Sequence, residues 1–126
     1  MMIYAYDDRK GLAMLEEALR TMLGDKMTFK GFTDSTALMM AAETTGYDIA
    51  FADVEYNGNS GMRLLGELSR QYPHSNYIGV TNNGSVLTAL TMHRIHACDY
   101  LVKPYYTEQL ADTLENLRFP VGRYSM

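Results

Sequence analysis

The sequence predicts one α/β domain in which a five-stranded parallel sheet is covered by helices on both faces. Short apolar runs alternate five times with segments whose apolar residues recur at helical spacing. Parallel strands need crossover connections, usually helices, so this alternation favours a parallel sheet over a set of hairpins. The length of 126 residues fits one domain and is too short for two of ordinary size.

The strands are predicted from short apolar runs that end at polar or turn-forming residues. The third run, Ile49-Ala50-Phe51-Ala52, leads directly into Asp53. A carboxylate after a buried segment is costly unless it is paired or opens a surface loop. In chain order, the expected strands cover residues 2–6, 27–32, 48–52, 77–80 and 98–102.

The helices are predicted from apolar residues three or four positions apart. Their expected apolar faces are Leu12, Leu15, Leu19 and Met22; Ala37, Leu38, Ala41 and Ala42; Met62, Leu64, Leu65 and Leu68; Val86, Ala89, Leu90 and His93; and Leu110, Leu114 and Leu117. Asp34 or Ser35 is expected to cap the second helix, and residues 56–61 have the composition of a loop. We expect residues 1–118 to form the domain and 119–126 to be a linker or a frayed C-terminal tail.

Composition narrows the range of functions. A net charge of −4 argues against direct nucleic acid binding through a basic face. No apolar run approaches the roughly 18 residues of a membrane helix. The lone cysteine, Cys98, cannot form an internal disulfide and is expected to be a small core residue. These features predict a cytoplasmic domain that does not bind membranes.

Polar side chains gather at the predicted carboxyl ends of four strands. In open parallel sheets, ligands bind beyond these ends. The residues concerned are Asp7 and Asp8 after the first strand, Asp53 after the third, Thr81 after the fourth and Lys103 after the fifth. Each has an ordinary structural interpretation when taken singly, such as a helix cap for the aspartates or a strand former for the threonine. Together they place three carboxylates, a hydroxyl and an ammonium at one sheet edge.

Phosphoryl transfer to a carboxylate is the chemistry that needs this set. Mg²⁺ binds one or two carboxylates together with phosphate oxygens and waters, so Asp7 and Asp8 are candidate ligands. Asp53 would supply the attacking oxygen. Lys103 would neutralise one phosphate oxygen, and the Thr81 hydroxyl would donate to another.

These residues resemble those of the CheY-like receiver domains of two-component response regulators. The matching motifs are Asp7-Asp8, "FADVEYNGNSG", Thr81 and "DYLVKP", and the resemblance runs from Met2 to about Leu117. It implies a doubly wound (βα)5 flavodoxin-like fold with strand order 2-1-3-4-5. It also implies a signalling domain that catalyses only its own phosphorylation and dephosphorylation.

The resemblance assigns a role to each site residue. Asp53 becomes the phosphoacceptor. Asp7, Asp8, Asp53 and the backbone carbonyl of Glu55 become the ligands of Mg²⁺, with Asp8 as a direct ligand, Asp7 acting largely through water, and Mn²⁺ as an alternative ion. Thr81 and Tyr100 become the switch pair, although Tyr100 can also be read as a core aromatic. Lys103 becomes the phosphate-contacting lysine, joined to Pro104 by a cis peptide.

Two residues depart from the family pattern. A proline usually stands at the position of Asn57, and a small residue usually follows the switch threonine where this chain has Asn82. We expect Glu55, Asn82 and Asn83 to tune the rate of phosphorylation and the lifetime of the phosphoryl group.

The resemblance also implies partners. We expect a sensor histidine kinase as phosphodonor. The face made by the fourth helix, fifth strand and fifth helix is expected to change on phosphorylation and to support a homodimer or an output contact. The segment "HACDYLVKPYY" hints at a C-terminal LytTR-type DNA-binding domain that controls transcription.

Three alternatives remain open at this point. A haloacid-dehalogenase-like phosphohydrolase would carry a second aspartate two residues after its nucleophile, where this chain has Glu55. A flavodoxin-like binding module would need a phosphate-cradling loop after the first strand, where "DDRKG" stands instead. A degenerate receiver would act only as an interaction scaffold.

Overall fold

Five parallel strands form one sheet in the order β2-β1-β3-β4-β5, which confirms the predicted topology. The computed structural model describes residues 1–95 and 99–121. The strands are β1 (Met2–Tyr6), β2 (Thr28–Phe32), β3 (Ile49–Asp53), β4 (Asn76–Thr81) and β5 (Asp99–Val102). The β3 strand lies at the centre of the sheet, and each of its residues is buried. This explains why it reads as a continuous apolar run.

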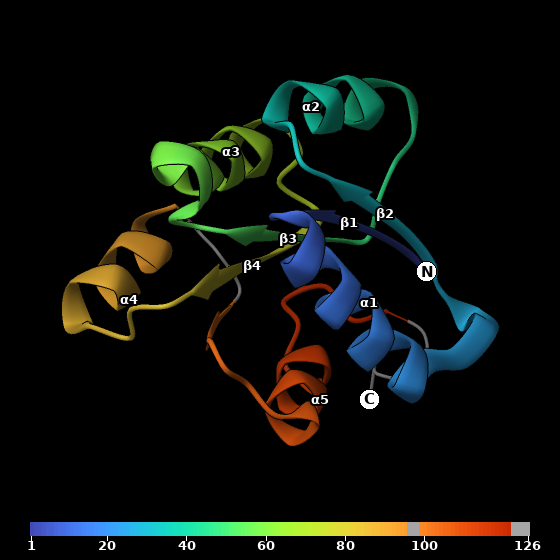
Figure 1. Cartoon of the computed structure of the whole chain (residues 1–126). Helices are drawn as coiled ribbons and strands as arrows, with labels where there is room; N and C mark the ends of the chain where they lie inside the picture. Colours follow the sequence, from blue (N-terminus) through green and yellow to red (C-terminus); the bar gives the residue numbers. More distant parts are fainter. Residues whose placement is uncertain (96–98, 122–126) are drawn as a thin grey trace.

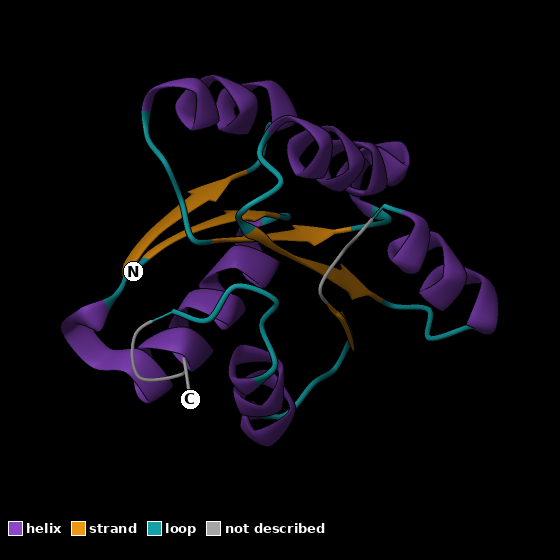
Figure 2. Cartoon of the chain, turned by 180° about the vertical axis from the view of Figure 1, so that it is seen from behind, coloured by secondary structure: helices purple, strands orange, loops and turns teal. Residues whose placement is uncertain are grey.

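Helices cover both faces of the sheet (Figure 1). They are α1 (Arg9–Leu23), α2 (Ser35–Thr44), α3 (Tyr56–Gln71), α4 (Val86–Arg94) and α5 (Thr107–Glu115), with a short 3₁₀ turn, η1 (Gly24–Lys26), after α1. The α1 and α5 helices pack on one face, and α2, α3 and α4 pack on the other. Figure 2 shows the same layers from behind, with the strands running between them.

Each face of the sheet has its own apolar core, because successive strand residues point to opposite faces. Ile3, Ile49 and Ile78 meet Leu19 of α1 and Leu114 of α5. The residues between them along the strands face α2, α3 and α4; this second core includes Tyr4, Ala50, Tyr77, Leu38, Leu65 and Met92. The two cores pack against both faces of the sheet, so the backbone positions at its carboxyl edge are well defined.

Capping residues start three of the helices. Asp8 accepts from the Gly11 N–H at α1, Asp34 accepts from the Ala37 N–H at α2, and Ser85 accepts from the Thr88 N–H at α4. These contacts satisfy backbone donors that have no partner within their own helix. The α2 cap is therefore Asp34 rather than Ser35.

The loop predicted after β3 interrupts the start of α3. Asn57, Gly58 and Asn59 have φ values of 54°, 69° and 64°, in the left-handed region. Asn and Gly tolerate this conformation better than other residues do. Regular helical geometry therefore resumes only after Asn59, in agreement with the loop composition of residues 56–61.

The apolar face predicted for the fourth helix is wrong. Leu90 of α4 is 54% exposed and His93 is exposed, whereas Met92 is only 2% exposed. Met92 lies over Gly79 of β4, where a Cβ would overlap the methionine side chain. Because Gly79 has no side chain, it leaves the space on the strand that the Met92 side chain fills. The side chain of Val86 and the whole of Cys98 lie outside the described residues.

The chain after α5 returns to Asn76, the first residue of β4, at the amino ends of the strands. The Phe119 N–H donates to Asn76 Oδ1, and Asn76 Nδ2 donates to the Phe119 carbonyl, both at 2.9 Å. Val121 packs against the core shared by α1 and α5. Residues 122–126 of the expected tail lie outside the described residues. Within the described part of the chain, no helix is long and apolar enough to cross a membrane.

Gly61 allows α3 to approach the end of β3, which makes it a test of the packing. A Cβ on Gly61 would overlap the backbone carbonyl oxygen of Asp53, and neither backbone can shift without disturbing both elements. We expect Gly61→Ala to lower the free energy of unfolding by at least about 2 kcal/mol, as overpacking does. Urea unfolding measures this change.

Gly46→Ala is the matched control, because nothing lies within 4 Å of a Cβ at Gly46. We expect it to change the free energy of unfolding by no more than about 0.5 kcal/mol. Equal effects of the two substitutions would contradict the close approach of α3 to β3.

Candidate functional site

The structure places four predicted site residues at the carboxyl edge of the sheet. Asp7 follows β1, Asp53 and Thr81 are the last residues of β3 and β4, and Lys103 follows β5. The register sets Asp53 opposite Val80, so Thr81 lies one step further along the neighbouring strand. The Lys103 N–H donates to the Thr81 carbonyl at 2.7 Å, which fixes the start of the Lys103 segment against β4.

Lys103 joins two buried carboxylates. Its Nζ donates to Asp53 Oδ2 at 2.7 Å and to Asp7 Oδ2 at 3.0 Å. Asp53 is 5% exposed and Asp7 is 7% exposed. Buried charges are costly unless they are paired, so both carboxylates depend on the Lys103 ammonium as their counter-charge.

The surroundings shift the pKa of two of these groups. Burial raises the pKa of Asp7; hydrogen bonds from Lys103 and from the Asp8 N–H oppose the shift but do not cancel it, and the Asp53 carboxylate adds to it. Burial lowers the pKa of Lys103, but hydrogen bonds and charges from Asp53 and Asp7 outweigh it, so the pKa rises overall. Lys103 therefore stays charged at neutral pH, while ionised Asp7 is the strained member.

Backbone donors fix the other oxygen of Asp53. Asp53 Oδ1 accepts from the Glu55 N–H at 2.9 Å and from the Tyr56 N–H at 3.0 Å. These two donors belong to the turn that enters α3, so the turn orients the carboxylate. With Lys103 on Oδ2, both carboxylate oxygens of Asp53 have defined positions.

Asp8 does not join the pair formed by Asp7 and Asp53. Its Oδ1 caps α1 by accepting from the Gly11 N–H at 2.7 Å, and the residue is exposed. Among the residues that the structure describes, no group of three His, Cys, Asp or Glu side chains is arranged to hold a metal ion. The helix cap gives Asp8 a local partner, whereas Asp7 is buried and turns to Lys103.

The remaining donor set still fits Mg²⁺. The carboxylates of Asp7 and Asp53 both contact the ammonium group of Lys103, so they lie close to each other. Mg²⁺ usually binds one or two carboxylates and completes its coordination shell with water and phosphate oxygens. The Glu55 carbonyl accepts from the Asn59 N–H at 3.3 Å, a long hydrogen bond that leaves its second lone pair for another partner. Gly11 leaves room beside Asp7, since a Cβ there would overlap its carboxylate.

The Glu55 side chain, expected from the sequence to tune the site, bonds to the end of β4, and this contact was not predicted. Glu55 Oε2 accepts from the fully buried Thr81 hydroxyl at 2.5 Å, and Glu55 Oε1 accepts from the Asn82 N–H at 2.8 Å. The Asn83 N–H donates to Thr81 Oγ1 at 2.9 Å. The sequence contains both partners of this contact, an acid two residues after Asp53 and a hydroxyl at the end of the next strand. They are 26 residues apart in the chain, so no local pattern connects them.

Tyr100 lies on β5, is half-buried and packs against the core shared by α2, α3 and α4. The peptide bond between Lys103 and Pro104 is cis. The Tyr100 side chain is thus attached to the strand that leads to Lys103 and lies on the same face of the sheet as α4.

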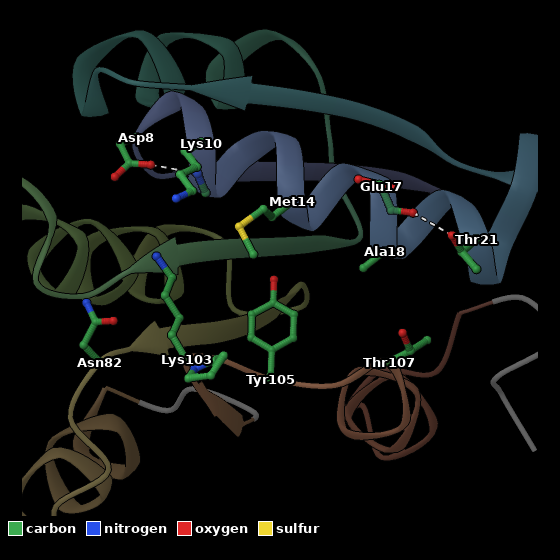
Figure 3. A pocket seen from close by; sticks show the side chains of 12 residues that line it. Asp8, Lys10, Met14, Glu17, Ala18, Thr21, Asn82, Lys103, Tyr105 and Thr107 are labelled. Carbon is green, nitrogen blue, oxygen red and sulfur yellow. Dashed lines mark hydrogen bonds between the residues drawn. The ribbon is translucent and has the colours of Figure 1, made fainter.

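A cavity of about 550 Å³ opens beside Lys103. It lies between α1 and the segment after β5, and its lining includes Asp8, Lys10, Met14, Lys103 and Tyr105 (Figure 3). Met14 and Tyr105 supply apolar surface, and Lys10 and Lys103 supply positive charge. The carboxylates of Asp8 and Glu17 also line it, so the cavity combines an apolar wall with charges of both signs.

The chain belongs to the response regulator receiver domain family, whose model matches residues 3–115. It is therefore a signalling domain of a class that is generally not counted among enzymes. This family membership also separates it from the haloacid-dehalogenase-like phosphohydrolases and from flavodoxin-like binding modules.

Relatives and solved structures agree with this assignment. The chain is 32% identical over 102 residues to the response regulator protein FleR of Pseudomonas aeruginosa and 22% identical over 113 residues to the DNA-binding transcriptional regulator NtrC of Salmonella typhimurium. The matches cover 77% and 90% of this chain but 22% and 24% of those proteins, so the chain spans about a quarter of their length.

The fold is similar to that of the response regulatory domain of protein mrkE from Klebsiella pneumoniae. The TM-score is 0.79 at 19% identity, and the match covers 93% of this chain and 94% of that one.

The raised pKa of Asp7 leads to a stability prediction. A carboxyl group whose pKa is raised by folding stabilises the fold when protonated, and this contribution is lost as pH rises through the raised pKa. At neutral pH with a chelator, Asp7→Asn removes the strained charge and leaves Lys103 paired with Asp53. We expect a gain on the order of 1 kcal/mol, or roughly 3–5 °C in the unfolding midpoint.

Thermal unfolding of wild type and Asp7→Asn at pH 7 and at mildly acidic pH checks this prediction. The difference should shrink as the pH falls, because wild-type Asp7 then takes up its proton. Asp25→Asn, at an exposed aspartate in η1, serves as the control. A lower midpoint for Asp7→Asn at pH 7 would show that ionised Asp7 stabilises the fold.

Proposed function

We propose that this domain accepts a phosphoryl group from a sensor histidine kinase onto Asp53 in a Mg²⁺-dependent reaction. The observation that supports this best is the setting of the Asp53 carboxylate. It is buried at the end of the central strand, oriented by two backbone N–H groups on one oxygen and by Lys103 on the other. Positioning and charge neutralisation are most of what such a transfer requires.

In the proposed transfer, one carboxylate oxygen of Asp53 attacks the phosphorus of a phosphohistidine. The new P–O bond forms as the P–N bond breaks, and the electron pair of that bond stays on the imidazole nitrogen, which takes a proton from solvent. Lys103 neutralises a phosphoryl oxygen, and the Thr81 hydroxyl donates to another once the phosphoryl group is in place.

Asp7, Asp53 and the Glu55 carbonyl would hold the Mg²⁺ ion, with Mn²⁺ as an alternative. Asp8 would be a further ligand, since only its Oδ1 accepts from the Gly11 N–H in the cap of α1. The bound ion supplies the positive charge that allows an anionic phosphoryl group to approach these carboxylates.

Phosphorylation would act on the face of α4, β5 and α5 through Thr81 and Tyr100. Large apolar side chains are exposed on these elements or directly before them: Leu90, Val102 and Tyr106, at 54%, 36% and 74%. This exposure supports a homodimer or an output contact on that face. The chain spans about a quarter of its relatives' length, and we propose that a C-terminal output domain accompanies it. One candidate for this output domain is a LytTR-type DNA-binding domain that controls transcription.

The phosphoacceptor assignment predicts the result of chemical labelling. With acetyl phosphate and Mg²⁺, wild type should gain one acid-stable, base-labile phosphoryl group. Asp53→Asn should gain none, because an amide oxygen is a poor nucleophile, and a chelator should suppress labelling of wild type. Intact-protein mass spectrometry measures this.

Asp25→Asn is the control for this experiment and should label as wild type does. Stoichiometric labelling of Asp53→Asn would contradict the assignment. Absence of labelling in all proteins would favour the alternative of a degenerate receiver that acts as a scaffold.

The switch assignment predicts where the structure responds. Beryllofluoride with Mg²⁺ mimics a phosphoryl group, and it should change amide hydrogen exchange in peptides from α4 and β5 as well as near Asp53. Tyr100 has an apolar ring and a polar tip, so it can be buried or exposed at modest cost. Tyr100→Ala should reduce the response in α4 and leave the response near Asp53 intact. A change confined to the surroundings of Asp53 would rule out the switch.

A further inference from the structure

The Glu55 carboxylate bridges two donors at the end of β4. Its two oxygens accept from the Thr81 hydroxyl and the Asn82 N–H, at 2.5 Å and 2.8 Å. Glu55 stands at the N-terminus of α3, but its side chain makes no capping hydrogen bond there. The side chain turns instead across the sheet edge toward the neighbouring strand. Charge-assisted contacts of this kind are the stronger class of hydrogen bond.

These donors lie where a phosphoryl group on Asp53 needs them. A phosphoryl group carries nearly two negative charges and three strong acceptor oxygens. Lys103 can serve one of these oxygens, since its Nζ is 2.7 Å from Asp53 Oδ2. Asp53 and Thr81 end adjacent strands, so the Thr81 hydroxyl and the Asn82 N–H are the neighbouring donors on the β4 side. In the structure, both are engaged by Glu55.

From this arrangement we infer that Glu55 is a built-in competitor of the phosphoryl group. Its carboxylate occupies the donors that an anionic group on Asp53 would use, and its own charge repels that group. It also holds the Thr81 hydroxyl against an anion before any phosphoryl group arrives. Glu55 therefore sets the affinity of the site for phosphoryl groups. This inference rests on the proposed function of Asp53.

Glu55→Gln separates this role from simple packing. Glutamine has the same length and removes the charge. In glutamine, one of the two carboxylate oxygens becomes an NH₂ group that can only donate, so Thr81 and Asn82 no longer face two anionic acceptor oxygens. Glu43→Gln is the matched control. Glu43 is exposed near the C-terminal end of α2, and its substitution changes the net charge by the same amount.

The experiment is a titration of each protein with beryllofluoride at fixed Mg²⁺, followed by the amide NMR signals of Asn82 and of α4. We expect Glu55→Gln to lower the dissociation constant at least about fivefold relative to wild type, which corresponds to about 1 kcal/mol. Glu43→Gln should match wild type. In the free proteins, the Asn82 amide signal should already be shifted in Glu55→Gln and unshifted in Glu43→Gln.

Equal or weaker binding by Glu55→Gln, while wild type binds, would overturn the inference and leave the proposed function standing. Failure of both wild type and Glu55→Gln to bind would contradict the proposed function itself. Magnesium titrations without beryllofluoride complete the test. If Glu55→Gln binds Mg²⁺ more weakly than wild type does, the carboxylate assists metal binding and is not a competitor of the phosphoryl group.

Discussion

The ammonium group of Lys103 between two buried carboxylates is the interaction on which the site depends. It joins residues that are 96 and 50 positions apart in the chain, so it forms only when the sheet is complete. Removing Lys103 would leave two buried carboxylates without a counter-charge, which is strongly destabilising, whereas neutralising Asp7 leaves Lys103 paired with Asp53. The strand order brings the ends of β1 and β3 side by side and places β5 close enough for Lys103 to reach both. The fold thus stabilises two buried carboxylates at the carboxyl edge of the sheet by pairing both with one ammonium group.

Much of this arrangement could be predicted from the sequence, because its determinants are local. Apolar runs followed by Asp or Thr identify the strands and their carboxyl ends together, as at Asp53 and Thr81. Parallel pairing then brings those ends to one edge of the sheet without further information. The composition of the segment from Asn57 to Asn59 likewise indicates left-handed turn residues, because few other residue types adopt that backbone conformation.

The features that could not be predicted depend on contacts between distant segments. Met92 is buried because Gly79 on β4 leaves space for it, and helical periodicity within α4 carries no trace of that glycine. Asp8 and Asp7 look equivalent in the sequence, yet one caps α1 and the other is buried against Lys103. Glu55 reaches Thr81 across two strand ends, and only the three-dimensional structure shows that its side chain accepts from the Thr81 hydroxyl and the Asn82 N–H.

A crystal structure with beryllofluoride and Mg²⁺ tests the central claim most directly, that Asp53, Lys103, Thr81 and Glu55 form one phosphoryl-binding site. The account predicts beryllium bonded to an Asp53 carboxylate oxygen and Lys103 Nζ within hydrogen-bonding distance of a fluorine. It also predicts that the Thr81 hydroxyl and the Asn82 N–H contact fluorines, with the Glu55 carboxylate displaced from both. Beryllofluoride bound elsewhere, or bound at Asp53 with the Glu55 bridge to Thr81 unchanged, would contradict it.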